Sequence, residues 1–580
     1  MGVNGELAAI FERTAQLVEL TGGNTFRAVA FQRAARALEA LPDDVGQMAR
    51  SEKPIAALTS ISGIGKGLAE KIIEYVNTGR IAEVDELAAQ VPPGVTELLN
   101  IPGLGPKTIA LFWKEAGITS LEQLKAKLAT DELAKLPRMG LKKIEAMRKS
   151  IGFAESAGAR VLLGRALPMG QWFVNGLQAM KGVKQAQFAG SLRRGRETIG
   201  DVDLVAAVGA KDAPAVAEAF VKLEPVTEVL VRGVTKTSVR VVEHMQVDLR
   251  IVEPHQYGAA LLYFTGSKEH NVRLRERAIR MGMSLNEYAL TKGEEIVAGN
   301  TEEEVYRALG LAWIPPELRE DRGEIALAEK GKLPTLIEIG DIKAELHAHT
   351  RASDGKWSIR ELAAAAAERG FHTVAVTDHS KGQVQANGLT AERLEQHIVA
   401  VRKVAAELKG TITVLAGSEV DILTDGSLDY PNSLLKELDI VVASPHAALT
   451  QDPKKATDRL LRAIHSPYVT IIGHATGRLL PRREGLAPDM KQVLAAAAER
   501  GIAMEINANS YRLDLRDLHA RAAIEAGVKS SINTDAHGPA DLDQLIFGIL
   551  TARRAGARKE DVVNAMSRET LARWIKGTRS

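Results

Sequence analysis

The middle of the chain reads Gly190-Ser-Leu-Arg-Arg-Gly195, then Gly200-Asp-Val-Asp203, then Gln246-Val-Asp-Leu-Arg250. Because alternate residues of a strand point to the same face, Asp201 and Asp203 would share a face. Asp248 interrupts a second apolar, alternating run, and a neighbouring strand would bring the three carboxylates together. Such a cluster suits paired Mg²⁺ ions, which assist in-line phosphoryl displacement. The pattern predicts a two-metal nucleotidyl-transfer site; the alternative is a solvated Asp-x-Asp at an exposed strand edge.

A glycine turn follows the strand-like segment that ends at Ala189. Backbone N–H groups at Gly190 and Ser191 can face a phosphate, and Arg193 and Arg194 stand beside them. We therefore expect the nucleotide to bind at this turn.

Composition limits the classes of protein that are possible. A length of 580 residues indicates about three to five domains. The net charge is +2, from 75 basic and 73 acidic residues, so a nucleic-acid site must be a local patch. The absence of cysteine excludes disulfides and thiolate metal ligands. We expect a cytoplasmic protein, since no apolar segment resembles a signal peptide or approaches the ~18 residues of a membrane span.

The organisation of the chain changes along its length. The first 155 residues have helical periodicity broken by Gly/Pro turns, 187–252 holds short β-branched runs, and helical patterns return after 270. None of the 13 histidines precedes His244 and ten follow residue 340, so the two halves are expected to do different chemistry. The charged, proline-bounded stretch Glu317–Pro334 is typical of a linker.

Two segments of the N-terminal region share one pattern, in which apolar-x-Gly-apolar-Gly precedes a helix. They run from Ile61 to Ile72 and from Ile101 to Leu111, and a degenerate third copy spans Leu136–Ile144. Glycines allow close backbone approach, and a helix N-terminus can hold a phosphate without reading base identity. One copy alone is more typical of a core helix-turn-helix, but two spaced copies followed by lysine favour helix-hairpin-helix elements on DNA. The DNA-binding candidates are Gly63, Gly65, Lys66, Gly103, Gly105 and Lys107.

Together with Tyr263-Phe-Thr-Gly-Ser267, these segments make the first 320 residues or so similar to family X DNA polymerases, the family of DNA polymerase beta. The resemblance implies that Asp201, Asp203 and Asp248 are catalytic and bind two Mg²⁺ or Mn²⁺ ions. It places Gly190, Ser191, Arg194 and Gly200 on the triphosphate. Tyr263 and Phe264, with Gly266, would wall the sugar, while Asn271 and Arg275 would reach the nascent base pair and the template minor groove. Gln246 departs from the arginine of several members, which puts the rate of primer activation in doubt.

The same resemblance implies a lyase-like domain at the N-terminus. Arg27, Arg33 and Lys71 fall where the family contacts the 5′-phosphate and deoxyribose, with Lys71 in the position of the Schiff-base amine. Phe31 stands where tyrosine is common, which weakens the lyase assignment, and phosphate binding by Lys71 is the alternative. In the family the hairpin carbonyls, here of Ile61, Ile64, Ile101 and Leu104, also hold Na⁺ or K⁺.

In residues 341–580, ligand-type side chains follow successive apolar strands, which alternate with helices as in a parallel βα barrel. The expected strands are Thr373–Val376, Thr413–Leu415, Ile440–Ala443, Val469–Ile472, Ala503–Ile506 and Ser530–Ile532. A lone histidine after a strand is more often structural, but six of the ten here fall at strand ends, where barrel active sites lie. Without sulfur, a cluster of Zn²⁺, Mn²⁺ or Fe²⁺ is expected.

This region resembles the polymerase-and-histidinol-phosphatase (PHP) domain. The resemblance implies up to three metal ions and phosphoester hydrolysis by metal-activated water. One ion would be held by His347, His349, Glu419 and Asp535, a second by Glu419, His446 and His474, and a third by Asp354, His379 and His537. Arg478, Arg482, Arg483 and Arg512 are candidates for binding the substrate, although loop arginines are usually solvated.

The predicted architecture is helical hairpin domains, a mixed-sheet nucleotidyltransferase palm, a small thumb and a C-terminal distorted βα, TIM-like barrel. The domains are a lyase-like domain (1–88), a fingers-like domain (89–155), the palm (156–255), the thumb (256–316), a linker (317–340) and the PHP domain (341–580). We expect a bacterial-type enzyme that is a monomer. It would fill short gaps in DNA during repair, using dNTPs, and trim 3′ ends as a 3′-5′ exonuclease. The alternatives are an end-processing nuclease or 3′-phosphatase whose polymerase half only binds DNA ends, a fused small-molecule phosphatase, and a non-enzymatic scaffold.

Overall fold

The structure, a computed structural model, describes residues 3–41, 45–61, 63–100, 104–130, 132–137, 139–141, 143–145, 147–148, 160–242 and 245–579. Two compact units divide the chain, Met1–Ser156 and Ala157–Ser580. Within the described residues, no helix combines the length and apolarity needed to cross a membrane.

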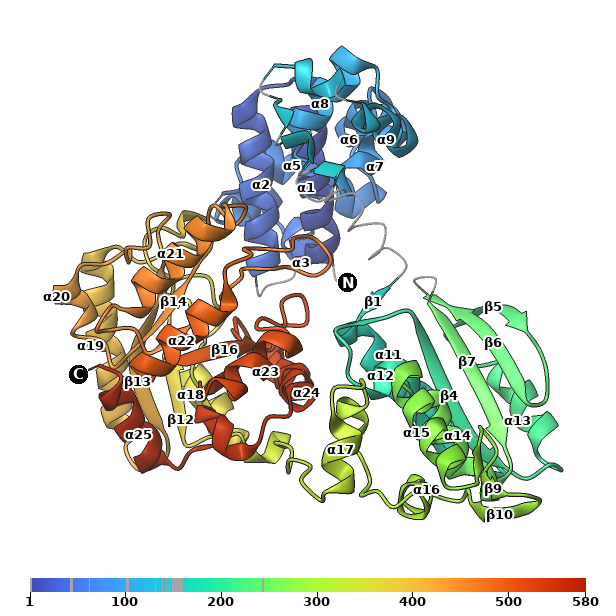
Figure 1. The fold of residues 1–580 in the computed structure, drawn as a ribbon. Helices are drawn as coiled ribbons and strands as arrows, with labels where there is room; N and C mark the ends of the chain where they lie inside the picture. The colour runs from blue at the N-terminus through green and yellow to red at the C-terminus, as the bar shows by residue number, and fades with distance from the viewer. Residues whose placement is uncertain are drawn as a thin grey trace. The chain divides into compact units, whose positions relative to one another are not determined.

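The first unit is helical in its described residues, as its sequence periodicity predicts. α1 packs along α2, and Phe11 meets Phe31 edge to face at a centroid distance of 5.5 Å (Figure 1). Phe31 is 2% exposed and therefore belongs to the core of this unit, not to a DNA-binding surface. The helices are α1 (Val3–Thr21), α2 (Thr25–Ala40), α3 (Val45–Ala49), α4 (Pro54–Thr59), α5 (Lys66–Thr78), α6 (Ala82–Ala89), α7 (Pro93–Glu97), η1 (Leu98–Asn100), α8 (Pro106–Ala116), α9 (Leu121–Ala129) and η2 (Glu132–Lys135).

The palm contains a mixed five-stranded sheet in its described residues, in the order β2-β4-β7-β6-β5. β4 and β7 are parallel and the other pairs are antiparallel. Apolar residues of the buried face pack against α11 and α13. The bounds are β1 (Val161–Leu162), α11 (Leu163–Gln178), β2 (Val183–Phe188), α12 (Gly190–Arg193), β3 (Thr198–Ile199), β4 (Asp201–Val208), α13 (Ala213–Phe220), β5 (Val226–Val231), β6 (Lys236–Val241), β7 (Gln246–Val252) and η4 (Pro254–Gln256).

The thumb packs helices on a small antiparallel sheet, β10-β9-β8. A buried ion group holds it to the palm, because Glu302 accepts hydrogen bonds from both Arg193 and Arg319. Its elements are α14 (Tyr257–Thr265), α15 (Lys268–Arg280), β8 (Ser284–Leu285), β9 (Leu290–Lys292), β10 (Glu295–Ala298) and α16 (Glu302–Ala308).

The segment expected to be a linker, 317–340, is not an exposed tether. It contains η5 (Pro316–Leu318), α17 (Glu324–Glu329) and η6 (Ile339–Asp341), and Arg319 is fully buried. Glu324 also bonds to His270 of α15 at 2.6 Å. Charged residues of this segment therefore take part in buried ion pairs. Composition alone cannot distinguish such paired charges from charges exposed to solvent.

The PHP region forms a parallel seven-stranded sheet within residues 344–533, in sequence order β11 to β17. Ala348 pairs with Ala536 just beyond the first and last strands, so that the sheet nearly closes into a barrel. Helices flank these strands (Figure 1). The strands are β11 (Ala344–Glu345), β12 (Thr373–Val376), β13 (Thr413–Asp421), β14 (Ile440–Ser444), β15 (Ile471–Ile472), β16 (Ala503–Asn507) and β17 (Ser530–Asn533). The helices are α18 (Ile359–Glu368), η7 (Val384–Ala386), α19 (Ala391–Glu407), α20 (Asn432–Leu435), α21 (Pro453–Ile464), α22 (Met490–Arg500), α23 (Asp517–Glu525), η8 (Pro539–Gln544), α24 (Leu545–Ala555), η9 (Lys559–Asp561), η10 (Val563–Ala565) and α25 (Arg568–Gly577).

The palm and the barrel share one hydrophobic core within the second unit. Leu480, Leu513 and Phe547 of the barrel belong to the buried cluster that contains the palm sheet. Gly164 of α11 lies so close to the barrel that a Cβ would meet Ser510 at 2.5 Å. The predicted architecture is confirmed, with the addition that the barrel is packed directly on the palm.

Candidate functional sites

The three palm aspartates meet at one edge of the sheet. Asp203 is the direct register partner of Asp248 on the parallel strands β4 and β7, and Asp201 lies two residues before Asp203 on the same face. Burial, followed by the charges of Asp201 and Asp248, raises the pKa of Asp203 to about 7. Burial and like charge therefore both disfavour ionisation of Asp203 in the metal-free cluster, and three carboxylates that meet in this way are a donor set that fits divalent cations.

The turn at Gly190 lies directly against this carboxylate cluster. Gly190 has φ +58°, which side-chain-bearing residues rarely adopt, and a Cβ there would stand 2.3 Å from Asp203 Oδ2. The Ala189 N–H also donates to the Asp203 carbonyl at 2.7 Å. Only glycine can bring the backbone this close to the aspartate.

A cavity of about 540 Å³ opens beside the aspartates. Its lining includes most of the predicted nucleotide-binding residues: Gly190, Ser191, Arg194, Tyr263, Phe264, Gly266, Asn271 and Arg275. Asp201 and Asp203 also line it, whereas Gly200 lies just behind Asp201, near Arg160. Thr265 and three cations, Arg160, Arg196 and Lys268, complete the described lining. The three cations were missed from the sequence, because isolated cations carry no motif. This concentration of cationic side chains suits a triphosphate.

Part of the cavity wall is aromatic. The rings of Tyr263 and Phe264 lie 5.2 Å apart, edge to face, and the Arg250 guanidinium stands over Phe264 at 4.9 Å. Asn271 Nδ2 donates to the Tyr263 carbonyl at 2.7 Å, and its buried Oδ1 has no hydrogen-bond partner among the described residues. That oxygen is available to a ligand.

Gln246, the departure from the family pattern, contacts the third carboxylate. Its Nε2 donates to Asp248 Oδ1 at 2.8 Å, while Lys236 Nζ lies 3.5 Å from Asp248 Oδ2. Gln246 therefore orients Asp248 without adding charge.

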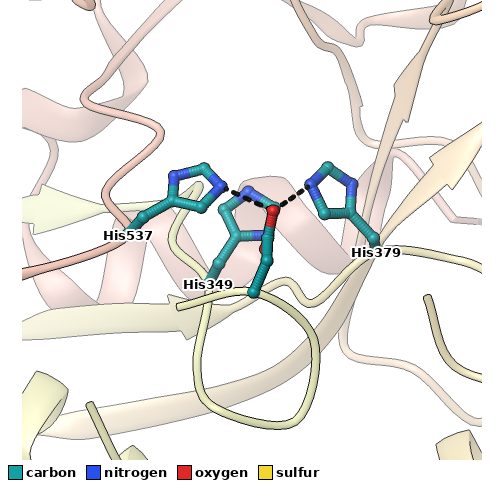
Figure 2. A group of neighbouring side chains, drawn as sticks. His349, His379 and His537 are labelled. Carbon is teal, nitrogen blue, oxygen red and sulfur yellow. Dashed lines mark ion pairs between the residues drawn. The ribbon is translucent and has the colours of Figure 1, made fainter. Parts of the chain in front are cut away.

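In the barrel, the nine predicted ligands converge at the carboxyl ends of the strands. Figure 2 shows the imidazole rings of His349, His379 and His537 turned toward one another. Three groups have ligand atoms within 4.8 Å of one another: His349, Asp354, His379 and His537; His347, His349 and Asp535; His379, Glu419 and His446. His474 joins the third group, since its Nε2 lies 2.8 Å from Glu419 Oε1. These groups overlap the three sets that the resemblance implied, with His349 and His379 each placed between two of them.

Glu419 occupies the centre of this cluster. Its Oε2 lies 3.4 Å from His347 Nε2 and 2.8 Å from His379 Nδ1, and its Oε1 lies 3.3 Å from His446 Nε2. Burial opposes ionisation of Glu419, but His446, His347 and His379 lower its pKa well below the ordinary value. Burial, followed by the charges of His537 and His379, lowers the pKa of His349 to about 4. A neutral His349 beside an ionised Glu419 is the protonation state that binds metal. Burial opposes protonation of His446 and His537, but the neighbouring carboxylates raise both pKa values to about 9, so these two rings lose a proton when metal binds.

The hydrogen bonding of the cluster also fits metal ions. Glu419 Oε2 faces His347 Nε2 at 3.4 Å and His379 Nδ1 at 2.8 Å without the alignment of a hydrogen bond, and the buried His349 Nδ1 also has no hydrogen-bond partner among the described residues. Buried polar atoms are nearly always paired, so a group of unpaired ones implies a missing ligand. The N and O donors suit Zn²⁺, Mn²⁺ or Fe²⁺.

Carboxylates behind the ligands fix the orientation of the rings. Glu505 accepts from His347 Nδ1 at 2.7 Å and from the His474 N–H at 2.7 Å, so that Nε2 of His347 points into the cluster. Asp421 holds His446 in the same way through Nδ1. Asp378, paired with His397 at 2.8 Å, accepts from the Ser353 hydroxyl beside Asp354. Glu505 was missed from the sequence, although a lone glutamate inside the apolar strand Ala503–Ile506 was a usable signal.

Replacing Glu505 with glutamine should weaken metal binding about 10- to 100-fold, the range for losing an outer partner of a ligating histidine. The amide keeps the shape but loses the negative charge that stabilises His347 as a ligand. Titration of metal-free protein with Mn²⁺ or Zn²⁺ in competition with a chelator would measure the effect. Glu499→Gln, on the exposed end of α22, is the matched control. Equal affinities in the two variants would contradict an orienting role for Glu505.

The four candidate arginines of the barrel lie in different surroundings. Arg512 Nε lies 3.7 Å from Asp535 Oδ2, and its buried Nη1 has no partner among the described residues. Arg483 is near enough to Arg512 to have its pKa lowered, after the larger effect of burial. Arg478 instead pairs with Glu197 of the palm at 2.7 Å, and Arg482 is exposed. Arg512, followed by Arg483, is best placed to meet a phosphate at the cluster.

The hairpin elements of the first unit expose their glycines and lysines. Gly65 precedes α5 and Gly105 precedes α8, and no side chain among the described residues caps either helix. A Cβ at Gly65 or Gly105 would meet no atom within 4 Å, and Lys66 and Lys107 are exposed. Both helix N-termini are therefore open to a phosphate. Gly103 and Ile101 lie outside the described residues.

Two of the three lyase candidates belong to one charged group. Arg27 and Lys71 both pair with Glu83, while Arg33 is exposed and its backbone lies beside Gly63. Of the carbonyls predicted to hold a monovalent cation, that of Ile61 accepts the Ile64 N–H at 3.0 Å. Cation binding at Ile61, Ile64 and Leu104 and lyase chemistry at Lys71 stay predictions.

Four family models match the chain, one of them at two places. They are a helix-hairpin-helix domain over 3–81, a SAM-like helix-hairpin-helix tandem over 55–110 and again over 95–152, a DNA polymerase beta thumb over 260–320, and a PHP domain over 345–509. The second tandem match includes the degenerate copy at Leu136–Ile144.

Similar proteins cover the chain in whole or in part. The chain is 38% identical to the DNA polymerase/3′-5′ exonuclease PolX of Bacillus subtilis (strain 168), over 98% of this chain and 99% of that protein. A probable phosphatase of Thermoanaerobacter sp. (strain X514) is 31% identical over 38% of this chain and 89% of its own length. DNA polymerase lambda of Rattus norvegicus is 29% identical over 51% of this chain and 53% of its own length.

Proposed function

We propose a function from the premise that this chain belongs to the bacterial PolX family, with helix-hairpin-helix domains, a DNA polymerase beta thumb and a C-terminal PHP domain. The protein is a DNA-directed DNA polymerase that fills short gaps during DNA repair. Its PHP domain is a metal-dependent phosphoesterase that acts on 3′ ends as a 3′-5′ exonuclease. The observation that carries the proposal is the register pairing of Asp203 with Asp248 beside a cationic cavity.

In the palm, Asp201, Asp203 and Asp248 would hold Mg²⁺ or Mn²⁺. Two such ions, when bound, stabilise the attacking and leaving oxygens of nucleotidyl transfer. Ser191, together with Arg194 and the other cationic side chains of the cavity, binds the triphosphate of a dNTP. Tyr263 and Phe264 limit the space around the sugar, which disfavours a ribose hydroxyl, and Asn271 and Arg275 face the nascent base pair.

In the barrel, the nine ligands would hold up to three ions of Zn²⁺, Mn²⁺ or Fe²⁺. Such ions, when bound, activate water for attack on phosphorus. Arg512 and Arg483 bind the phosphate of the 3′-terminal nucleotide beside the cluster. Glu505 and Asp421 keep the imidazoles oriented while substrate exchanges.

The substrate is gapped or nicked double-stranded DNA, bound by the exposed hairpins of the first unit. Phosphate contacts at α5 and α8 give affinity with little sequence preference, and binding weakens steeply with salt. We propose a monomer that works in the cytoplasm, where gapped chromosomal DNA and dNTPs are found.

One assay tests the assignment of both activities. With one-nucleotide-gapped DNA and Mg²⁺ or Mn²⁺, we expect extension by one nucleotide when the matching dNTP is present and shortening of the primer when dNTPs are absent. Products separated on a denaturing gel distinguish the two. Shortening without any extension would favour the alternative, an end-processing nuclease or 3′-phosphatase whose polymerase half only binds DNA.

A second candidate for the barrel is a small-molecule phosphatase, favoured by the match to a probable phosphatase over 38% of the chain. Hydrolysis of a 3′-recessed DNA end should be faster than that of a free phosphate monoester at equal concentration. The reverse order would favour the small-molecule activity.

A further inference from the structure

The barrel contributes a buried arginine to the surroundings of the nucleotide cavity. Arg554 lies on α24 and its side chain is 4% exposed. Its Nη1 donates to Glu320 Oε1 at 2.8 Å and to the backbone carbonyl of Arg194 at 2.8 Å. One barrel side chain therefore bonds both to the backbone of a predicted triphosphate ligand and to the carboxylate beside it.

Glu320 transmits this contact to the Arg194 side chain. Arg194 Nε donates to the same Glu320 oxygen at 3.1 Å, and Nη1 donates to the Thr265 carbonyl at 2.5 Å. Glu320 is 8% exposed and Arg194 is 11% exposed, so the pair is largely desolvated, where charge interactions are strong. Arg194 lines the cavity, and these bonds engage its Nε and Nη1, so Nη2 is the part of the guanidinium that they leave for a ligand.

Arg554 is itself held from the barrel side. Its Nη2 donates to Asp517 Oδ2 at 2.8 Å, and Arg322 donates to the same oxygen at 3.1 Å. Burial opposes ionisation of Asp517, but Arg554 and Arg322 lower its pKa to about 2. Burial likewise opposes ionisation of Glu320, and Arg554 and Arg194 lower its pKa below the ordinary value. Both carboxylates are therefore ionised at neutral pH, and their hydrogen bonds hold the Arg554 guanidinium between them.

We propose that Arg554 of the PHP barrel is a positioning residue for the polymerase: through Glu320 it sets the Arg194 guanidinium in the geometry that receives the dNTP triphosphate. The inference rests on the proposed polymerase function. The barrel would thereby serve synthesis as well as hydrolysis, by a contact that does not involve its metal ligands.

The test is the kinetics of gap filling by the full-length Arg554→Met protein. Methionine fills much of the space but carries no charge, so Glu320 loses one of its cations and the Arg194 carbonyl loses its donor. We expect KM for the dNTP to rise about 10-fold, since small misplacements of substrate-binding groups cost up to about 100-fold. KM for gapped DNA and the rate of 3′-end hydrolysis should not change. Arg554→Lys should recover part of the loss.

Arg553→Met is the matched control. Arg553 is the neighbouring residue of α24 and makes a similar junction pair, with Glu317 at 2.6 Å, but it does not contact Arg194 or Glu320. Its KM for the dNTP should equal that of the wild type. An equal rise in both variants, or an unchanged or lowered KM in Arg554→Met, would overturn the proposal.

A second variant covers the case in which Arg554→Met does not fold. Glu320→Gln keeps the shape of the connecting side chain and removes its charge, and it should raise KM for the dNTP in the same way; an unchanged KM would overturn the proposal. A wild-type protein that adds no nucleotide would instead refute the proposed polymerase function, so the two failures are distinguishable.

Discussion

Asp203→Asn should abolish gap filling while leaving 3′-end hydrolysis intact. Asparagine keeps the shape that Gly190 accommodates but removes one of three charges that would hold the divalent ions. We expect the rate of nucleotide addition to fall by about 10³-fold, the scale on which one electrostatic stabiliser of a transition state acts. Single-turnover extension of a one-nucleotide gap at saturating Mg²⁺ would measure it.

The stability of this variant separates loss of chemistry from loss of fold. The raised pKa of Asp203 means that its ionised form is unfavourable in the metal-free fold, so asparagine should preserve or raise the thermal midpoint. Glu228→Gln, on the exposed strand β5 of the same sheet, is the control and should extend normally. Extension by Asp203→Asn at the wild-type rate would refute the catalytic assignment.

Glu419→Gln should give the opposite result, with loss of hydrolysis and normal gap filling. Glu419 touches ligands of all three groups, and the amide cannot balance the charge of an ion there. Losing an outer partner of a metal ligand costs up to about 100-fold, and losing a ligand itself should cost more. We therefore expect 3′-end hydrolysis to fall by more than about 100-fold. Release of mononucleotide from a 3′-recessed primer, together with the metal content of the purified protein, would measure both effects.

The control for Glu419→Gln is Glu368→Gln, on the exposed end of α18. Preserved gap filling in the same preparation shows that the palm, which shares its core with the barrel, is still folded. Wild-type hydrolysis with a normal metal content would contradict the central role of Glu419. A loss of both activities would indicate a folding defect, which the thermal midpoint would reveal.

Local patterns in the sequence predicted much of the fold. β12 has the bounds expected from its apolar run, Thr373–Val376, and Asp203 meets Asp248 because strand alternation fixes which face each residue occupies. The barrel ligands were predictable because they follow strands, and strand ends gather at one face of a barrel.

The features that the sequence did not reveal depend on contacts between distant segments. Arg160, Glu505 and Arg554 each act through a partner far along the chain, and nothing beside them in the sequence marks that partner. The segment 317–340 was predicted to be a linker because it is charged and bounded by proline. In the structure its charges are paired with residues elsewhere, such as Glu317 with Arg553. Composition records the charge but not its partner.

The hydrophobic core shared by palm and barrel has an evolutionary consequence. A domain joined only by a flexible tether can be lost or exchanged without harm to its neighbour, whereas removing this barrel would expose Leu480, Leu513 and Phe547 contacts of the palm to water. Selection should therefore retain the barrel even in descendants whose histidines have drifted. Lineages with an eroded metal cluster but an intact α24 would be the expected trace of that history.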